Sequence, residues 1–123
     1  MDWCDEALVR FCQGFELNVP VSQRALISLQ FDDVGLLQLE RHGTQLTLWL
    51  VLEVAYFEAS TMIERALRLT SSRMAPVLPL RCGWVGEGEL LLFITLAGHQ
   101  VTLSALQQAY RTLLDTRQQV LGR

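Results

Sequence analysis

Two histidines and three cysteines are the residues of this sequence whose chemistry could support a nucleophilic or a metal-binding site. His42 lies in a predicted hairpin turn, and His99 lies in the segment before the last predicted helix. Cys4 and Cys12 both fall on the apolar stripe of the first predicted helix, without the spacing of metal ligands and without an imidazole nearby. We therefore expect solvated histidines and small, buried, reduced cysteines rather than a catalytic or metal centre.

A pair of adjacent carboxylates and a glycine-rich segment are the next candidates for chemistry. Asp32 and Asp33 are neighbours, and neighbouring strand residues point to opposite faces, so this pair indicates a turn rather than an acid–base site. Segment 83–88 is rich in glycine but precedes a strand, so it offers no helix N-terminus to a phosphate. No P-loop, GxSxG or HExxH motif occurs. We expect a protein that is not an enzyme and uses no cofactor, unless a concave pocket gathers polar groups unseen in the sequence.

Composition excludes several further classes of function. The chain has 123 residues, half of them apolar, with 13 acidic and 10 basic side chains. All the basic residues are arginines spread singly along the chain, so no patch neutralises several phosphates, and nucleic acid is not an expected partner. The first residues are acidic where a signal peptide is basic, and the apolar runs are shorter than the ~20 residues of a membrane span. We expect one soluble cytoplasmic domain, residues 1–123, without membrane insertion.

Hydrophobic periodicity predicts an α+β fold with a mainly antiparallel sheet and three helices, in the order α-β-β-β-α-β-β-α. In the third strand, leucines at alternate positions share one face, and the opposite face, with Trp49 and Val51, is only partly polar, so we expect both faces to be covered. Helix caps are expected at Ser60 or Thr61 and at Thr102 or Ser104. The expected elements are a helix over 2–16, strands over 26–31, 37–41 and 46–52, a helix over 58–72, strands over 80–84 and 89–97, and a helix over 102–121.

The amount of apolar surface is large for a chain of this length. Three tryptophans fall in three different elements, and the first helix carries apolar residues at nearly half of its positions. Most of the leucines are expected in the core. For Met62, Leu69, Trp84 and one rim of the first helix, a core position and an intermolecular surface remain equally open.

Several strings of residues resemble the SycN-type class I chaperones of the bacterial type III secretion system. They are GLLQLERHG (35–43), LTLWL (46–50) and LPLRCGWVGE (78–87), with Trp3, FCQ (11–13) and QQVL (118–121) at the two ends. The strings cover most of the chain and include tryptophans and glycines, which are specific markers.

The resemblance implies a chaperone subunit that forms a heterodimer with a YscB-like small chaperone. Pairing in this family uses the middle helix and the strand after it. In this sequence the corresponding residues are Met62, Ile63, Ala66, Leu67, Leu80, Cys82 and Trp84.

The resemblance also implies a client, the N-terminal segment of a YopN-like secreted gatekeeper protein. The segment would wrap around the dimer in an extended form, dock in apolar grooves and pair with sheet edges, without ATP, and would stay secretion-competent. Candidate client contacts are Trp3, Leu8, Phe11 and Phe15 in the first helix and Leu37, Leu39 and Trp49 in the sheet.

A second reading keeps the same surfaces but changes the partner. The chain would then be a homodimeric protein-binding adaptor without a secretion client, with the apolar face covered by a second copy. For the chaperone reading, the expected location is the bacterial cytoplasm, including the inner face of the inner membrane near the export apparatus.

Overall fold

The computed structural model describes residues 4–17, 26–32, 34–71, 80–86 and 88–122. Three helices and five strands follow in the predicted order α-β-β-β-α-β-β-α, with two short 3₁₀ turns, η1 and η2. The fold class is thus confirmed. The elements are α1 (Asp5–Gln13), β1 (Leu26–Phe31), β2 (Gly35–His42), β3 (Gln45–Glu53), η1 (Tyr56–Glu58), α2 (Ala59–Leu69), β4 (Leu80–Val85), β5 (Glu89–Ala97), η2 (Gly98–Gln100) and α3 (Leu103–Leu121).

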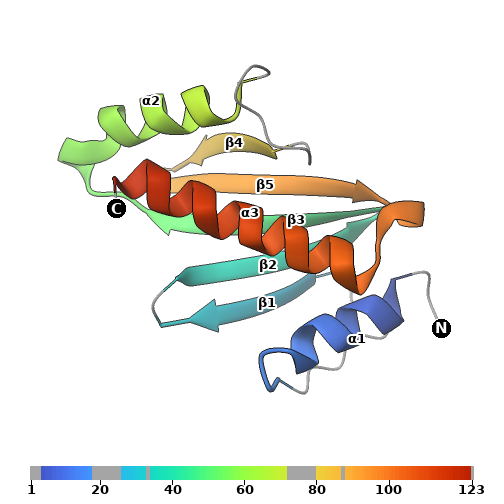
Figure 1. Ribbon diagram of the computed structural model, residues 1–123. Coiled ribbons are helices and arrows are strands. Elements are labelled where there is room, and N and C mark those ends of the chain that lie inside the picture. The colour runs from blue at the N-terminus through green and yellow to red at the C-terminus, as the bar shows by residue number, and fades with distance from the viewer. Residues whose placement is uncertain (1–3, 18–25, 33, 72–79, 87, 123) are drawn as a thin grey trace.

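The strands form one antiparallel sheet in the order β1-β2-β3-β5-β4 (Figure 1). Consecutive strands β1, β2 and β3 form a meander, because short turns allow antiparallel neighbours to pair directly. The chain then leaves the sheet through η1 and α2 and returns as the β4–β5 hairpin, with β5 beside β3. The edge strands of the described sheet are therefore β1 and β4.

Alternation along the strands places most of their leucines on one buried face. Leu46, Leu48, Leu50 and Leu52 of β3 are all buried, and the register sets Leu50 between Leu37 of β2 and Leu92 of β5. Burial of each such side chain contributes about 1.5–3 kcal/mol to folding. The core is thus a layer of aliphatic side chains from all five strands.

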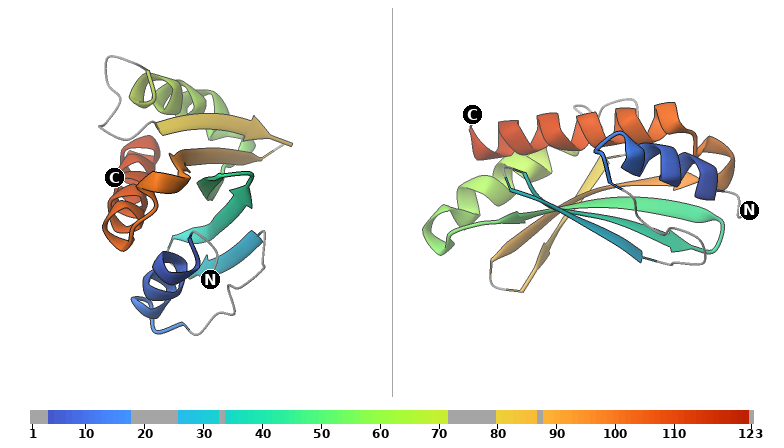
Figure 2. Two further views of the ribbon diagram at one scale, coloured as in Figure 1. Left: turned by 90° about the vertical axis from the view of Figure 1, so that its right-hand side faces the viewer. Right: turned by 90° about the horizontal axis from the view of Figure 1, so that it is seen from below.

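Helices cover only this leucine-rich face (Figure 2). α1 and α3 pack against each other, α3 also contacts β3 and β5, and α2 lies against α3 and β4. No helix of the described chain lies over the opposite face, which carries Trp49 and Val51. The expectation that both faces are covered is therefore wrong for the described chain: the cross-strand neighbours of these two residues, rather than a helix, make them half-buried.

The helix caps predicted from the sequence agree with the structure at α3 but not at α2. The Thr102 hydroxyl accepts a hydrogen bond from the Ala105 amide at 3.1 Å, which confirms one of the two caps considered for the last helix. α2 begins at Ala59, directly after η1, and has no side-chain cap, so the cap predicted at Ser60 or Thr61 is wrong. The chain enters α2 from a 3₁₀ turn, which already supplies a hydrogen-bonded first turn.

Candidate functional site

The residues first considered for chemistry are dispersed in the structure. Cys4 and Cys12 are buried, Cys82 is half-buried, and all three are free thiols. Burial raises the pKa of the Cys12 thiol, which disfavours the nucleophilic thiolate. His42 Nε2 lies 2.7 Å from Thr47 Oγ1, within a chain of hydroxyls that continues to Thr95. Among the described residues, no group of three histidine, cysteine or carboxylate side chains is arranged to hold a metal ion.

An exposed apolar strip runs along α2 and the edge strand β4, and we call it the α2–β4 surface. It contains Leu67, which is 59% exposed, and Trp84 at 38%, with half-buried Ile63 on α2 and Cys82 on the same face of β4 as Trp84; Val85, at 48%, lies on the opposite face of β4. Exposed large apolar residues that gather in this way are typical of protein–protein contacts. Val85 was missed in the sequence because it follows the alternating residues Leu80, Cys82 and Trp84 on the other side of the strand.

The remaining residues predicted for a dimer interface lie inside the subunit. Met62, Ala66 and Leu80 are buried in the core, so they have little surface to offer a partner. Met62 and Ala66 are one turn apart and face inward, which turns Leu67 outward. In the isolated chain these three residues support the α2–β4 surface from within, and their place in a dimer interface stays a prediction.

Most of the residues predicted to contact a client are also core residues. Leu8, Phe11, Leu37 and Leu39 are buried, because the inward stripe of α1 and the inward positions of β2 face each other. These four side chains offer almost no surface to a client in the isolated chain, and their role as client contacts stays a prediction. Trp3 lies outside the described residues.

Phe15 belongs to an aromatic cluster that closes the gap between α1, α3 and the end of β1. Its ring centroid lies 5.2 Å from those of Phe11 and Tyr110 and 5.0 Å from that of Phe31. Aromatic rings in edge-to-face or tilted arrangements at these separations stabilise the fold beyond the effect of burying their surface. Phe15 is half-buried and therefore retains some accessible surface.

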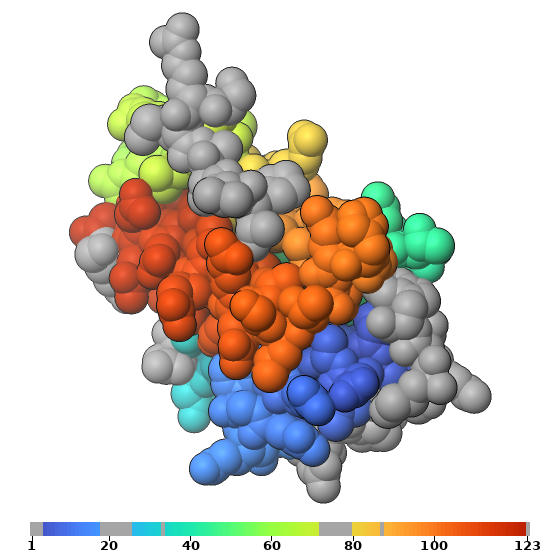
Figure 3. Space-filling model, turned by 45° about the vertical axis from the view of Figure 1, so that its right-hand side comes forward, coloured from blue at the N-terminus to red at the C-terminus, as the bar shows by residue number. Residues whose placement is uncertain are grey.

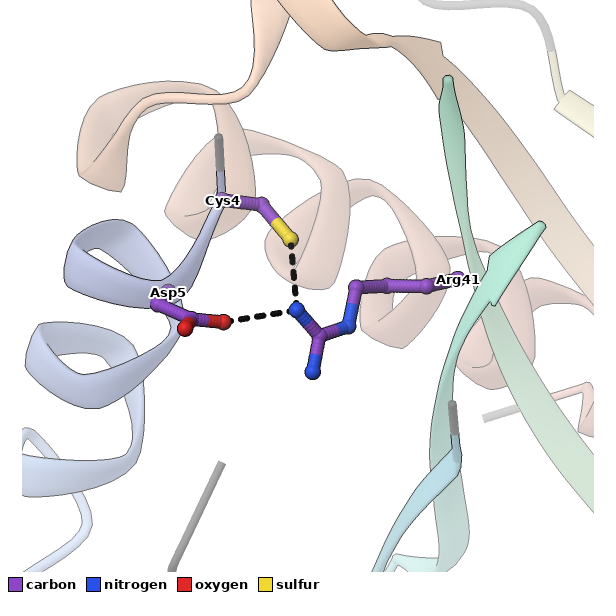
Figure 4. A network of polar contacts seen from close by, with 3 residues as sticks. All are labelled: Cys4, Asp5 and Arg41. Atoms are coloured by element: carbon purple, nitrogen blue, oxygen red, sulfur yellow. Dashed lines mark hydrogen bonds and ion pairs between the residues drawn. The ribbon is translucent and has the colours of Figure 1, made fainter. Parts of the chain in front are cut away.

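A buried ion pair attaches the start of α1 to the sheet (Figure 4). Arg41 Nη1 donates to Asp5 Oδ1 at 2.6 Å and lies 3.7 Å from Cys4 Sγ. The two charged side chains are only 8% and 2% exposed. This contact, together with the packing of α1 on α3 seen in the space-filling view, holds α1 over the sheet (Figure 3).

Trp49 lies on the face of the sheet that no described helix covers, and its neighbours there are apolar. Its ring centroid is 4.5 Å from that of Phe93 in β5. The register places Val51 beside Leu36 and Leu91 on the same face. We call these residues the open-face patch: Leu36, Trp49, Val51, Leu91 and Phe93, all half-buried. Of these five residues, only Trp49 was predicted from the sequence to contact a client. The other four could have been found because they are apolar residues at the outward-facing positions of their strands.

Unpaired backbone is available at both sides of the described sheet. β1 and β4 each pair with one neighbour, so their outer N–H and C=O groups face away from the sheet. Leu26, at the start of β1, is exposed. An extended segment can therefore add to an edge while its side chains reach apolar residues nearby.

Comparison with known proteins identifies the family. The model of the family described as type III secretory system chaperone SycN matches residues 3–121. The chain belongs to the SycN family of type III secretion chaperones. Relatives in this family include chaperone protein SycN of Yersinia enterocolitica and of Yersinia pseudotuberculosis serotype I, each 42% identical over 124 residues and 99% of both chains.

Solved structures of similar fold come from other type III secretion complexes. A chain of the heterodimeric ExoU–SpcU complex of Pseudomonas aeruginosa matches with a TM-score of 0.70 and 18% identity, over 92% of this chain and 93% of that one. A chain from the Yersinia pestis chaperone SycH bound to a fragment of YscM2 matches with a TM-score of 0.69 and 15% identity, over 92% and 94%. At these identities the likeness shows the fold of the SycN-family chain, not its partners.

Membership of the SycN family establishes this protein as a type III secretion chaperone. A chaperone acts by binding, and the surfaces described above are apolar strips and unpaired strand edges. Within the described chain, no helix is long and apolar enough to cross a membrane.

Proposed function

We propose that this chain is one subunit of a heterodimeric chaperone, paired with a YscB-like small chaperone. The dimer binds the N-terminal segment of a YopN-like gatekeeper protein, keeps it secretion-competent and supports its regulated secretion. It works by binding alone, without catalysis or ATP, in the bacterial cytoplasm and at the inner face of the inner membrane near the export apparatus.

The observation that carries the proposed pairing is the exposed apolar α2–β4 surface on an edge strand. Leu67 and Trp84 expose large apolar side chains at the place where β4 forms an edge of the described sheet. Burial of this strip against a second chaperone removes apolar area from water, and each square ångström contributes about 25 cal/mol. The buried residues Met62, Ala66 and Leu80 support the strip from within.

For the client, two accessible features replace the buried residues that the sequence suggested. The outer edge of β1 offers backbone hydrogen bonds that tolerate different side chains. The open-face patch, with Trp49 and Phe93 at its centre, offers apolar contact over several strands. A client that loses conformational entropy on binding needs such wide contact to compensate.

The proposal is tested by co-expressing the chain with the YscB-like chaperone and the gatekeeper N-terminal segment, followed by native mass spectrometry. A 1:1:1 complex is expected. Leu67→Glu and Trp84→Arg each place a charge in the apolar contact and should release the second chaperone. Gln107→Glu introduces a charge at an exposed position of α3 and is the matched control, expected to leave the complex intact.

Two results would contradict the proposal. A homodimer that ignores the second chaperone would favour the adaptor without a secretion client. A heterodimer that persists in both the Leu67→Glu and the Trp84→Arg variants would show that pairing uses another surface.

A further inference from the structure

Two adjacent aromatic residues project from the short turn between β3 and α2. Tyr56 is 91% exposed and Phe57 is 84% exposed, more than any other large apolar side chain of the described chain. We call this pair the aromatic knob. Neither residue entered the interfaces predicted from the sequence, because the turn lies outside every periodic segment.

The knob is presented by a well-anchored turn. Val54, just before it, is buried, and its amide donates to the Gly88 carbonyl at 2.8 Å, which ties the turn to the β4–β5 hairpin. The Glu58 amide donates to the Ala55 carbonyl at 2.9 Å, and α2 follows at once (Figure 1). Little conformational freedom of the turn is therefore left to lose when the knob binds.

The knob continues the α2–β4 surface at one end. η1 leads directly into α2, and its anchor Gly88 belongs to the turn after Trp84 and Val85. A stable interface buries about 800 Å² on each partner. Two fully enclosed aromatic rings supply about 150–250 Å² each, so the knob provides a large share of that area.

The charges around the knob define the chemistry of its partner. Glu58 belongs to the same turn, and exposed Glu53 and Glu89 lie directly opposite each other on β3 and β5 at its base. Like charges directly opposite across two strands are destabilising. Arg117 lines a hollow beside this pair, and basic side chains of a partner would offset the remaining negative charge, including that of Glu58, when the rings bind.

A second copy of this chain is a poor partner for the knob. A half-open hollow of about 430 Å³ at this end of the sheet has room for a ring, but its lining includes Asp32, Glu53 and Glu89 with Arg117. A second copy that inserted its knob there would bring its own three glutamates against these carboxylates. The acidic lining therefore disfavours pairing of two identical chains through the knob.

We infer that Tyr56 and Phe57 are an aromatic anchor that inserts into an apolar socket with a basic rim on the partner chaperone, not on a second copy. This inference rests on the proposed heterodimer. It identifies one contact between the two chaperones and gives a reason why two different chains pair rather than two copies of this one. The anchor belongs to the class of exposed aromatic residues that dominate binding energy once buried.

Site-specific photo-crosslinking tests the inference in the complex co-expressed with the YscB-like chaperone and the gatekeeper segment. The photoreactive residue p-benzoylphenylalanine replaces Phe57 in one sample, Leu67 in a second and Gln107 in a third. The residue at position 57 is expected to crosslink to the small chaperone, and the one at position 107, on the exposed side of α3, is not. Mass spectrometry of the adduct identifies the occupant.

The three positions separate failure of the inference from failure of the proposed function. A crosslink from position 67 but not from position 57 to the small chaperone would overturn the anchor and leave the heterodimer standing. A crosslink from position 57 to a second copy or to the gatekeeper segment would overturn the anchor as well. Absence of any crosslink to the small chaperone from positions 57 and 67 would overturn both.

Affinity provides a second readout. The double variant Tyr56→Ser/Phe57→Ser should raise the Kd of the heterodimer about 30-fold. Its thermal unfolding should match that of the unchanged chain alone, because both side chains are already in solvent. Tyr56→Phe keeps the ring and should bind normally. An unchanged Kd in the double variant would contradict the inference.

Discussion

At the residue scale, the ion pair between Asp5 and Arg41 stands out in a core that is mainly apolar. Both side chains are almost fully buried, and their nitrogen and oxygen atoms are 2.6 Å apart. Removing two charges from water is costly, so such a pair survives only when each charge keeps its partner. The pair thereby specifies where α1 begins relative to β2.

Arg41→Leu should lower the free energy of unfolding by about 3–5 kcal/mol, because it removes the guanidinium that pairs with the buried Asp5 carboxylate. Denaturation by urea measures the change. The matched control is Arg10→Leu, since Arg10 pairs with Glu6 at 3.1 Å on the exposed side of α1. That variant should change stability by less than about 1 kcal/mol.

The double variant Asp5→Leu/Arg41→Leu separates the charge from the packing. It removes both buried charges and should recover much of the stability lost in Arg41→Leu. If the double variant were as unstable as the sum of the two single variants, the two side chains would contribute independently and the ion pair would not explain the position of α1.

Cys12 predicts a loss of stability in alkaline solution. Burial raises its pKa in the folded chain, so the folded state holds the proton more tightly than the unfolded state does. The contribution of Cys12 to the free energy of unfolding is complete below the ordinary thiol pKa of about 8.5. It is lost as pH rises through the higher pKa of Cys12 in the folded chain. Between pH 8 and pH 10, the free energy of unfolding should fall more steeply in the unchanged chain than in Cys12→Ala.

Chemical denaturation at several pH values measures this difference, and the comparison cancels the titration of tyrosines. The slope attributable to Cys12 is at most ~1.4 kcal/mol per pH unit. Parallel pH profiles for the two proteins would contradict a raised pKa of Cys12.

At the element scale, the two faces of the sheet differ in residue type. The inward positions of β3 and β5 are leucine or isoleucine, whereas the other face mixes Trp49, Phe93 and Val51 with threonines and glutamates. A sheet face that faces only water would be more polar. The open-face patch is therefore the part of the sheet suited to an apolar client.

Trp49→Ser should weaken capture of the gatekeeper N-terminal segment by the heterodimer at least tenfold, because it removes the largest ring of the open-face patch. Isothermal titration of the purified heterodimer with the segment measures the effect. Heterodimer formation should be unchanged, since β5 separates β3 from β4 and the helices lie on the other face of the sheet.

Gln38→Ser is the matched control for Trp49→Ser, because Gln38 is the cross-strand neighbour of Trp49 on the same face but is polar. It should leave capture of the segment nearly unchanged. Equal affinities for the Trp49→Ser variant and the unchanged heterodimer would place the client elsewhere, with the β1 edge as the next surface to test.

At the scale of the whole molecule, binding of a partner should raise the stability of the folded chain. A partner that binds only the folded chain adds about 1.4 kcal/mol for each tenfold rise in its free concentration above Kd. The thermal midpoint of this chain should therefore rise as the YscB-like chaperone is added. Calorimetry of the mixture measures the shift, and Leu67→Glu should abolish it.

A constant thermal midpoint over a hundredfold range of the second chaperone would contradict pairing in solution. The same titration with a second copy, that is, with rising concentration of the chain alone, separates the heterodimer from the homodimeric adaptor.

The sequence by itself determined the class and order of the elements. Strand and helix periods are local, so the leucine alternation of β3 and the stripe of α1 were readable without tertiary contacts. The same holds for the cap at Thr102, whose hydroxyl bonds an amide only three residues away. Family membership followed from strings of residues in the same way.

Only the tertiary structure decided which apolar residues are core and which are surface. Leu8, Phe11, Leu37 and Leu39 look like a binding stripe in the sequence, yet they are buried because two inward faces meet. Tyr56 and Phe57 carry no periodic signal, yet they are the most exposed apolar pair of the described chain. Burial depends on what packs against a face, and that partner lies far away in the chain or on another molecule.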